Sequence, residues 1–285
     1  MPNAPHAELG EDLAVLVAET GTLREAVPLS RRGPDAAATA FRLRFADGSL
    51  RKGVRLMDAA HAERVAGLAA LLGDGVPRVY GRHATALLTE WVEGDTLAAD
   101  CDDDVLRACG AWHGWVHALR PEPDEAAAGL LRLWGKVLPI NLETLRAAGV
   151  LTADEVARCV ALAARHAPAR AAGGISLIDY CPENIVRRAS GVPCLIDIET
   201  LDVTPTDHDL ARTWYRWPMR AEQRDAYLQG YRRHRDPAPF LAHRPFWMLL
   251  ALAYGAVFRL EQRVAEIGVP LAQLRDLLRE SAGEC

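Results

Sequence analysis

The sequence predicts an α+β protein of two lobes, in which a small antiparallel sheet with one helix precedes a larger, mainly helical lobe. Three observations support this prediction. Two alternating runs flank an Asp-Gly pair near the N-terminus, helical periodicity dominates after Gly94, and short strand-like runs interrupt the helices between residues 175 and 198. We place the boundary between residues 93 and 94. Residues 1–93 then form the N-terminal lobe and residues 94–285 the C-terminal lobe.

The clearest local signal is a hairpin in the first lobe. Apolar and charged residues alternate on both sides of Asp47-Gly48, and this dipeptide between two alternating runs is a strong hairpin signal. A two-residue turn there places Leu43 opposite Lys52 and Phe41 opposite Val54. Because cross-strand partners share a face, we expect Lys52 to point to the same side as Phe41.

The other elements follow from periodicity and from Gly and Pro breakers. Apolar residues at three- and four-residue spacing indicate helices, whereas short alternating or β-branched runs indicate strands. Helices are expected over 12–20, 59–72, 103–119, 130–148, 153–167 and most of 210–278. Short strands are expected over 79–80, 84–92, 175–178, 185–186 and 194–198.

Composition and charge exclude several classes of protein. Half of the residues are hydrophobic, a quarter are charged, and the net charge of -5 comes from mixed signs, so a nucleic-acid partner is not indicated. The longest apolar run, Phe246 to Phe258, is too short to span a bilayer. The first 20 residues lack a secretory signal pattern, and the six cysteines form no CxxC pair. We expect a cytoplasmic protein with reduced thiols and no membrane partner.

Two acidic motifs carry the strongest functional signal. Asp179 lies five residues before Asn184 in Leu-Ile-Asp-Tyr-Cys-Pro-Glu-Asn, and Asp197 follows in Leu-Ile-Asp-Ile-Glu. A loop carboxylate can accept or orient the proton of an acceptor hydroxyl. An asparagine oxygen and a second carboxylate can hold Mg²⁺ against the phosphates of ATP, because this ion prefers hard oxygen ligands. The spacing therefore suits phosphoryl transfer.

These motifs resemble the catalytic loop and metal-binding segment of the aminoglycoside phosphotransferase and choline kinase families, which have a two-lobed, protein-kinase-like fold. Those families carry His-Gly-Asp, four residues, Asn, and later an apolar-Asp-apolar-acid motif. The resemblance implies that Asp179 is the catalytic aspartate and that Asn184 and Asp197 are the Mg²⁺ ligands. Glu199 matches the trailing acid, or is a surface acid at a strand end. Asp209, in Asp-Leu-Ala, takes the place of an aspartate that braces the catalytic loop.

The first lobe is similar to the same families. Leu-Thr-Glu-Trp-Val-Glu-Gly, over residues 88–94, resembles the interlobe hinge whose backbone carries adenine. Lys52 would contact the ATP phosphates and Glu63, on the following helix, would hold that lysine. Arg55 is the alternative phosphate ligand, although strand parity and the distance from Glu63 favour Lys52. The implied adenine contacts are Glu90, Trp91 and Val92.

Several residues near these motifs have two interpretations. His113 and His117, four apart on one helix, could share a metal, but we expect His117 to pack beneath the catalytic loop. The acids at 102–104 could attract a cationic substrate, although a helix start also favours acids. Trp214 and Trp217 could line an acceptor pocket or belong to the core. Cys181 is near the proposed site, but no base is placed to activate it.

Taken together, the resemblance implies an ATP- and Mg²⁺-dependent phosphotransferase acting on a small-molecule hydroxyl. The acceptor classes to consider are an aminoglycoside-like antibiotic, an amino alcohol, a sugar and a natural-product intermediate. Two departures support an alternative. Leu177 stands where the families have histidine, and the phosphate-covering loop, over residues 31–38, contains only Gly33. The alternative is a catalytically silent relative that binds a nucleotide or ligand and regulates. A weaker alternative is an unrelated helical binding protein with chance motifs.

Overall fold

The computed structural model describes residues 9–31, 38–119, 124–262 and 264–281. The glycine-poor loop expected over residues 31–38 lies mostly outside the described residues. Arg31 and Ala38, the first and last residues of that range, pair in the sheet.

Contacts divide the chain into two compact units, each made of two stretches of sequence. The first unit is Met1–Leu97 with Glu183–Asp202, and the second is Ala98–Pro182 with Val203–Cys285. The boundary expected between residues 93 and 94 would leave the stretch 183–202 in the helical lobe. This stretch instead packs with the first unit, where Thr96 forms an antiparallel bridge with Val186.

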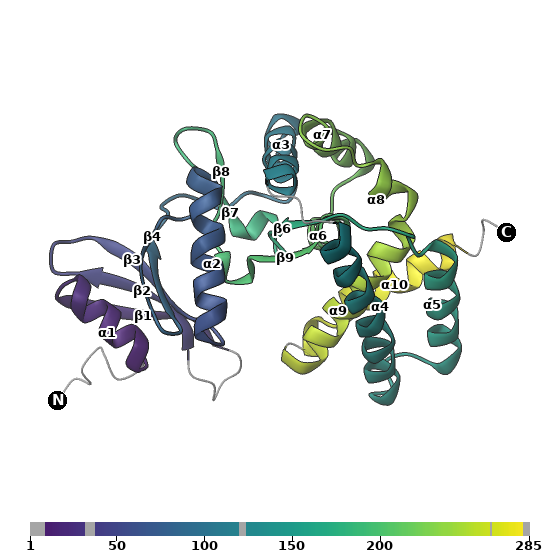
Figure 1. The fold of residues 1–285 in the computed structure, drawn as a ribbon, viewed down its shortest axis with the longest axis horizontal. Coiled ribbons are helices and arrows are strands. Elements are labelled where there is room, and N and C mark those ends of the chain that lie inside the picture. Colours follow the sequence, from purple (N-terminus) through teal and green to yellow (C-terminus); the bar gives the residue numbers. More distant parts are fainter. Residues whose placement is uncertain (1–8, 32–37, 120–123, 263, 282–285) are drawn as a thin grey trace. The chain divides into compact units, whose positions relative to one another are not determined.

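The first unit contains a five-stranded antiparallel sheet with the strand order β1-β2-β3-β5-β4 (Figure 1). The predicted α+β class is confirmed by this sheet and by the mainly helical remainder. The elements of the first unit are α1 (Glu11–Thr20), β1 (Leu23–Arg31), β2 (Ala38–Phe45), β3 (Leu50–Arg55), α2 (Ala59–Leu72), β4 (Val79–His83) and β5 (Ala86–Glu90). The hairpin of β7 (Ile185–Arg187) and β8 (Pro193–Leu195) completes the unit, with the short 3-10 turn Ile198–Thr200 after it.

Strand β1 is the one element of this sheet that the sequence pattern does not predict. Pro28 interrupts its alternation, and the β1–β2 pairing shifts register on either side of the stretch that contains it. Proline is tolerated in a sheet mainly on an edge strand, where its missing N–H faces outward. Because β1 lies at the sheet edge, it can form a strand although Pro28 interrupts its alternating sequence pattern.

The β2–β3 hairpin forms, but the predicted register is wrong by one residue. Lys52 lies opposite Arg42. The loop has three residues instead of two, because the Phe45 N–H donates to the Ser49 carbonyl at 3.0 Å and Gly48 has a φ of 85°. A three-residue loop with a left-handed glycine is a common hairpin closure. Lys52 therefore points away from the face of Phe41, which packs in the α1 core.

The second unit is built around helices. They are α3 (Asp103–Leu119), α4 (Asp124–Ala147), α5 (Ala153–His166), α6 (Thr206–Arg216), α7 (Ala221–Tyr231), α8 (Ala238–Ala242), α9 (Arg244–Gln262) and α10 (Gly268–Glu280), with β6 (Gly173–Ser176) paired to β9 (Asp202–Pro205). The apolar run predicted as a buried helix is α9, whose residues Phe246–Ala256 are mostly buried and which packs against α4, α5, α6 and α10.

Helices α3 and α7 approach each other unusually closely. A Cβ atom on Gly110 would lie 2.0 Å from the Tyr227 carbonyl oxygen, and one on Gly230 would lie 2.0 Å from the Arg107 carbonyl oxygen. Real Cβ atoms do not make such contacts, so both positions require glycine. This close packing places two tyrosines of α7 beside two histidines of α3, with consequences for the site described below.

Among the described residues, no helix combines the length and the apolar character needed to cross a membrane.

Candidate active site

A buried lysine and two carboxylates form the centre of the first unit. The Lys52 ammonium lies 3.0 Å from Asp197 Oδ1 and 2.9 Å from Glu199 Oε1, and it donates to the Ile196 carbonyl at 3.2 Å. Strand β8 ends just before these acids, and the 3-10 turn that follows directs both toward β3. Burial by itself would lower the pKa of Lys52, but the two carboxylates outweigh burial and raise it. The ammonium is therefore charged throughout the physiological range.

Glu199 has an unsatisfied oxygen in this cluster. Its buried Oε2 atom has no hydrogen-bond partner among the residues that the structure describes. Burial, reinforced by the neighbouring Asp197 and opposed by Lys52, raises the pKa of Glu199 above its usual range. Buried polar atoms are normally satisfied, so an orphaned carboxylate oxygen is a place where a cation would fit.

Asn184 lies beside Asp197 because the β7–β8 hairpin closes there. The Asn184 carbonyl accepts a 2.8 Å hydrogen bond from the N–H of Ile196, the residue before Asp197. The side chains of Asn184, Asp197 and Glu199 each offer oxygen donors, which are the ligands that Mg²⁺ and Ca²⁺ prefer. Together with the orphaned oxygen of Glu199, the residues present fit a hard divalent cation.

The expected pairing of Glu63 with Lys52 is wrong. Helix α2 buries Ala62 and Val65, so the intervening Glu63 lies on the solvent-exposed side. The ion pairs of Lys52 are formed by Asp197 and Glu199 instead. The alternative phosphate ligand, Arg55, hydrogen-bonds the Ala38 carbonyl and lies against Gly10 at the start of α1. It is therefore turned away from the carboxylates.

A cavity of about 290 Å³ in the first unit brings together four of the residues singled out from the sequence. The four are Lys52, Glu90, Trp91 and Val92. Apolar side chains of Leu29, Val186 and Ile196 also line it. Gly94, the last residue of the expected hinge, has a φ of 132°, and a Cβ atom there would lie 2.8 Å from Val186 Cγ1. Glycine therefore permits the chain to turn closely over one wall of this cavity.

Arg188 is a residue of this region that sequence reasoning missed. Its guanidinium binds the Glu90 carboxylate through two hydrogen bonds of 2.8 and 2.7 Å. This interaction is the main reason that the pKa of Glu90 is lowered. The side chain of Glu90 is thereby fixed at the wall of the cavity. No sequence signal connects two residues so far apart in the chain.

Asp179 belongs to the second unit, where two arginines of α6 reach its carboxylate. Arg216 Nη1 donates to Asp179 Oδ1 at 2.8 Å, and Arg212 Nη2 lies 3.5 Å from the same oxygen. The two arginines are four residues apart, so they share one face of the helix. Arg216 also contacts the Cys181 sulfur at 3.5 Å. The sequence signal that could have indicated these two arginines is their four-residue spacing directly after Asp-Leu-Ala.

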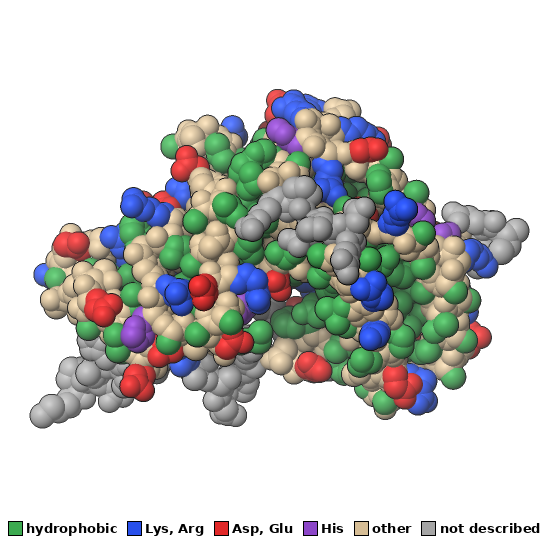
Figure 2. Space-filling model, viewed as in Figure 1, with side chains coloured by type: hydrophobic (Ala, Val, Ile, Leu, Met, Phe, Trp, Pro, Cys, Tyr) green, Lys and Arg blue, Asp and Glu red, His purple; other side chains and the backbone are tan. Residues whose placement is uncertain are grey.

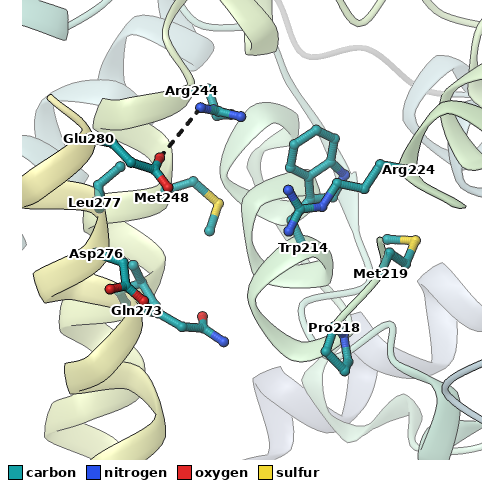
Figure 3. Close-up of a pocket in the computed structure, with 11 residues that line it drawn as sticks. Trp214, Pro218, Met219, Arg224, Arg244, Met248, Gln273, Asp276, Leu277 and Glu280 are labelled. Carbon is teal, nitrogen blue, oxygen red and sulfur yellow. Dashed lines mark ion pairs between the residues drawn. The ribbon is translucent and has the colours of Figure 1, made fainter. Parts of the chain in front are cut away.

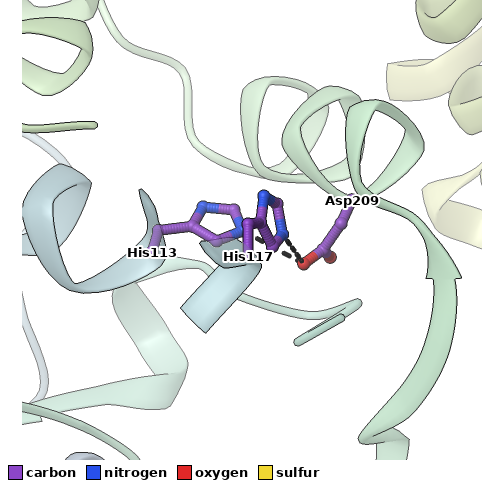
Figure 4. A group of neighbouring side chains, drawn as sticks. All are labelled: His113, His117 and Asp209. Carbon is purple, nitrogen blue, oxygen red and sulfur yellow. Dashed lines mark hydrogen bonds and ion pairs between the residues drawn. The ribbon is translucent and has the colours of Figure 1, made fainter. Parts of the chain in front are cut away.

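Asp209 braces the loop that precedes Asp179. Its carboxylate accepts hydrogen bonds from the backbone N–H groups of Leu177 at 2.7 Å and Ile178 at 2.6 Å. It also accepts from the Nε2 atoms of His113 and His117, each at 3.0 Å (Figure 4). All three side chains in Figure 4 are fully buried. Although burial alone would raise the pKa of Asp209, its hydrogen bonds with the histidines lower it well below the usual range.

The two histidines are parts of a buried hydrogen-bond network. Because a carboxylate only accepts, both Nε2 atoms carry a proton, and each Nδ1 atom is hydrogen-bonded with a tyrosine hydroxyl, that of Tyr227 for His113 and that of Tyr231 for His117. Burial, with the neighbouring His113, lowers the pKa of His117 to about 3. His113, His117 and Asp209 also have the spacing of a metal site. Since each ring nitrogen and each carboxylate oxygen already has a partner, we assign the cluster to bracing the loop.

The loop contains a strained residue directly before Asp179. Ile178 has a φ of 59°, a left-handed conformation that is a genuine outlier for a β-branched side chain. The Asp179 N–H donates to the Leu177 carbonyl at 2.6 Å across this turn, and Arg212 Nε donates to the Ile178 carbonyl at 3.2 Å. Leu177 and Ile178 occupy the positions of histidine and glycine in the motif that this segment resembles.

The structure also shows where Trp214, Trp217 and the acids at 102–104 lie. Trp217 is fully buried and donates to the Ala99 carbonyl, so it belongs to the core. Trp214 lines a second cavity of about 290 Å³, where the Arg224 guanidinium lies 5.0 Å from its ring (Figure 3). Helix α3 begins at Asp103, and Asp104 pairs with Arg107 at 2.7 Å, as expected of a helix start.

Comparison with known proteins places this geometry in a family. The model of the phosphotransferase enzyme family matches residues 29–242. A search of curated protein sequences returned no match.

Three solved structures share the fold at low sequence identity, so each likeness concerns the fold alone. The choline kinase LicA from Streptococcus pneumoniae is 14% identical, with a TM-score of 0.66 over 93% of this chain and 97% of its own. A macrolide 2'-phosphotransferase of type I is 15% identical, with a TM-score of 0.64 over 91% and 94%. The amicoumacin kinase hAmiN, in complex with AMP-PNP, Ca²⁺ and Ami, is 16% identical, with a TM-score of 0.61 over 99% and 96%.

Proposed function

Because the chain belongs to the phosphotransferase enzyme family, we propose that it is an ATP- and Mg²⁺-dependent kinase that phosphorylates a hydroxyl group of a small molecule. It would act in the cytoplasm, without a nucleic-acid or membrane partner. The first unit would bind the nucleotide. Asp179 in the second unit would position the acceptor hydroxyl.

The observation that carries the proposal is the position of Lys52. This lysine lines the cavity that also contains the expected hinge residues, and its ammonium contacts Asp197 and Glu199. Adenine would occupy the apolar part of the cavity, between side chains such as Leu29 and Val186. The triphosphate would then extend toward the lysine, whose charge would bind it.

Asn184, Asp197 and Glu199 would hold the metal ion. When bound, Mg²⁺ supplies positive charge that neutralises the phosphate oxygens during transfer. The three side chains supply the hard oxygen donors that this ion prefers. Lys52, which contacts two of the three in the structure, would move to the phosphates when the cation occupies the carboxylates.

Asp179 would orient the acceptor hydroxyl and take its proton. The hydroxyl oxygen attacks the γ-phosphorus, the bond from that phosphorus to the β,γ-bridging oxygen breaks, ADP leaves, and the hydroxyl proton passes to the Asp179 carboxylate. Arg216 fixes this carboxylate through a 2.8 Å hydrogen bond, and the Asp209 brace fixes the backbone before it. Positioning of this kind supplies much of the catalysis in phosphoryl transfer.

Mg²⁺-dependent ATP binding and turnover test the proposal. Wild type should bind ATP by calorimetry with Mg²⁺ present, and Lys52→Met and Asp197→Asn should each weaken binding at least about tenfold. Asp202→Asn is the matched control, since this acid pairs with Arg64 at 3.0 Å on the same segment. The proposal fails if wild type binds no nucleotide, or if the control loses as much affinity as Asp197→Asn.

A nucleotide-binding protein without transfer activity is the second candidate. The left-handed Ile178, at a position where the resembled motif has glycine, favours it, as does the engagement of Asp179 by two arginines. Turnover of ATP with any hydroxyl acceptor, lost in Asp179→Asn, would exclude this candidate. Binding of nucleotide with no transfer to a panel of aminoglycosides, amino alcohols, sugars and hydroxy acids would favour it.

A further inference from the structure

The cavity beside Trp214 lies on the side of helix α6 that faces away from Asp179. Trp214 lines this cavity, whereas Arg212 and Arg216 of the same helix reach the Asp179 carboxylate, at 3.5 and 2.8 Å. Each arginine is two positions from Trp214, and two residues turn an α-helix by about 200°. A ligand in the cavity would therefore be separated from the proposed catalytic aspartate by the helix.

The cavity has the size and the lining of a site for a small molecule. Its volume is about 290 Å³, and residues of α6, α7, α9 and α10 surround it (Figure 3). This volume is near the lower end for ligand pockets, so the occupant must be small. The apolar part of the lining is Pro218, Met219, Met248, Leu252 and Leu277. The two methionines have flexible side chains that adapt to the shape of a ligand.

Arg224 contributes to this cavity a cation that has no carboxylate partner. Its guanidinium lies 5.0 Å from the centre of the Trp214 ring and reaches across that ring toward α10 (Figure 3). Its Nε atom is buried, and within the described part of the chain the side chain forms neither a hydrogen bond nor an ion pair. Burial, with the charge of Arg244, lowers the pKa of Arg224, and Glu280 opposes that change. The surroundings thus disfavour a positive charge that the protein nevertheless places there.

The acids that line the cavity have other basic partners. Glu280 lies 3.9 Å from Arg244, and Asp276 pairs with Arg279. Neither carboxylate forms an ion pair with Arg224. Because both are negative charges at the same cavity, a singly charged anion suits it better than a phosphate dianion.

The indole N–H of Trp214 is a second donor without an acceptor. Trp214 is only 6% exposed, and its Nε1 atom has no hydrogen-bond partner among the residues that the structure describes. Phe240 packs edge-on against the ring, with centroids 5.1 Å apart, and holds it in place. Buried polar atoms normally have hydrogen-bond partners. Since both orphaned atoms, Trp214 Nε1 and Arg224 Nε, are donors, this wall of the cavity lacks an acceptor group.

We propose that this cavity binds a small organic carboxylate with an apolar body. The carboxylate would bind Arg224, whose planar N–H donors match two oxygens at once. Gln273 extends from α10 into the same cavity (Figure 3) and offers an amide N–H to the same group. The apolar body would contact Met219, Met248 and Leu277. Binding needs neither a nucleotide nor Asp179, so this proposal is independent of the proposed function.

Exposed hydrophobic side chains elsewhere in the second unit do not contribute to this site. Figure 2 shows such side chains over α4 and α9, where Leu133 and Phe258 are exposed. Neither of these residues lines the cavity. The apolar contacts of the ligand are therefore those inside the cavity, which limit the size of its body.

Four probes without a hydroxyl group test the proposal, because none of them can accept a phosphoryl group. They are 3-phenylpropanoate, its amide, 3-phenylpropylamine and acetate. Binding is measured by calorimetry to the full chain without nucleotide. We expect 3-phenylpropanoate to bind at least about tenfold more tightly than the amide, which lacks the charge, and than acetate, which lacks the apolar body. The amine should bind more weakly than the amide, since Arg224 would repel it.

Variants show whether the cavity and its arginine cause the preference. Arg224→Gln should reduce the preference for the acid over the amide about tenfold, and Arg224→Lys should retain part of it. Met248→Trp, at a half-buried position of the lining, should fill the cavity and weaken 3-phenylpropanoate and its amide alike. Arg233→Gln, at an exposed position of the same unit, and Asp179→Asn should leave binding unchanged. Thermal unfolding verifies that each variant is folded.

Four results would overturn the proposal. The acid and the amide bind equally, or the preference for the acid survives Arg224→Gln. Asp179→Asn removes binding of 3-phenylpropanoate, which would place this probe at the acceptor site instead. The last is that no probe binds at millimolar concentrations. Failure of wild type to bind ATP would refute the proposed function and would leave this test unaffected.

Discussion

The carboxylate of Asp209 accepts a 2.6 Å hydrogen bond from the N–H of Ile178, and it thereby helps to hold a β-branched residue in a left-handed conformation. Asp179 follows immediately in the chain. The direction in which Asp179 leaves the loop therefore depends on a strained residue and on the buried network that stabilises it. Strain of this kind persists only where the surroundings over-determine the backbone.

Replacing Ile178 with glycine should stabilise the protein. A left-handed conformation costs a branched residue about 1 to 2 kcal/mol more than glycine, and Ile178 is only half-buried, so little packing is lost. We expect the free energy of unfolding to rise by about 1 kcal/mol in urea titrations. Ile175→Gly, in the buried strand β6, is the control and should lower it by several kcal/mol. Ile178→Ala loses nearly the same packing but keeps the left-handed strain, so a lower stability for Ile178→Gly than for Ile178→Ala would show that the conformation is not strained.

Asp209→Asn should be among the most destabilising substitutions in the second unit. The amide has one acceptor oxygen and places an NH₂ group toward donors, whereas the carboxylate accepts four hydrogen bonds. Loss of a buried charge that several donors satisfy costs about 3 to 5 kcal/mol. Urea unfolding measures the loss. An effect below about 1 kcal/mol would contradict the bracing role.

Gly110→Ala should be strongly destabilising because the new methyl group would overlap the Tyr227 carbonyl oxygen at 2.0 Å. We expect a loss of about 3 kcal/mol or more, since helices α3 and α7 must separate. Gly67→Ala in α2 is the matched control. A Cβ atom at Gly67 meets nothing within 4 Å, so that variant should gain about 0.5 to 1 kcal/mol from helix propensity. Thermal unfolding distinguishes the two.

His208→Phe should make the protein less sensitive to acid. His208 is buried against Trp134, with ring centroids 4.0 Å apart, and neither of its ring nitrogens has a hydrogen-bond partner among the described residues. Burial, with the charge of Arg212, lowers the pKa of His208 to about 3. The unfolded chain therefore binds a proton that the folded chain does not, between about pH 6.5 and 3. Stability from this source is present above pH 6.5 and is lost as the pH falls.

The expected size of that effect is about 2 kcal/mol at pH 5 relative to pH 7. Urea unfolding of wild type and His208→Phe at the two pH values measures it, and the variant should lose about that much less on acidification. His117, which has the same shift for the same reason, continues to contribute. His234→Phe, at an exposed position, is the control. An unchanged pH dependence for His208→Phe would show that His208 does not resist protonation in the folded state.

Much of the secondary structure could be predicted because local sequence specifies it. Helix α3 has the predicted bounds, and its acidic start and apolar periodicity lie within the helix itself. The hairpin was predicted from Asp47-Gly48, but its register depends on whether the loop has two or three residues. The backbone conformation of Gly48 decides that, and an Asp-Gly pair is compatible with either loop length.

The partners of the predicted site residues were harder to obtain. For Lys52, the sequence analysis predicted the wrong face of the strand and the wrong partner, Glu63. The structure places Lys52 beside Asp197. Its pairing with Asp197 joins β3 to the turn after β8. Nothing in the local pattern at either position indicates the other. The assignment of Lys52 to the phosphates of ATP remains a prediction.

The fold class, most helices and the acidic motifs around Asp179 and Asp197 were predictable from the amino-acid order, because periodicity, breakers and motif spacing are properties of neighbouring residues. The pairing of charges was not: Arg188 meets Glu90, and Arg212 and Arg216 meet Asp179, only in the folded chain. These pairs join segments distant in the chain, and packing of whole elements sets their distances. Electrostatic attraction then depends on those distances and on burial, which no local pattern encodes.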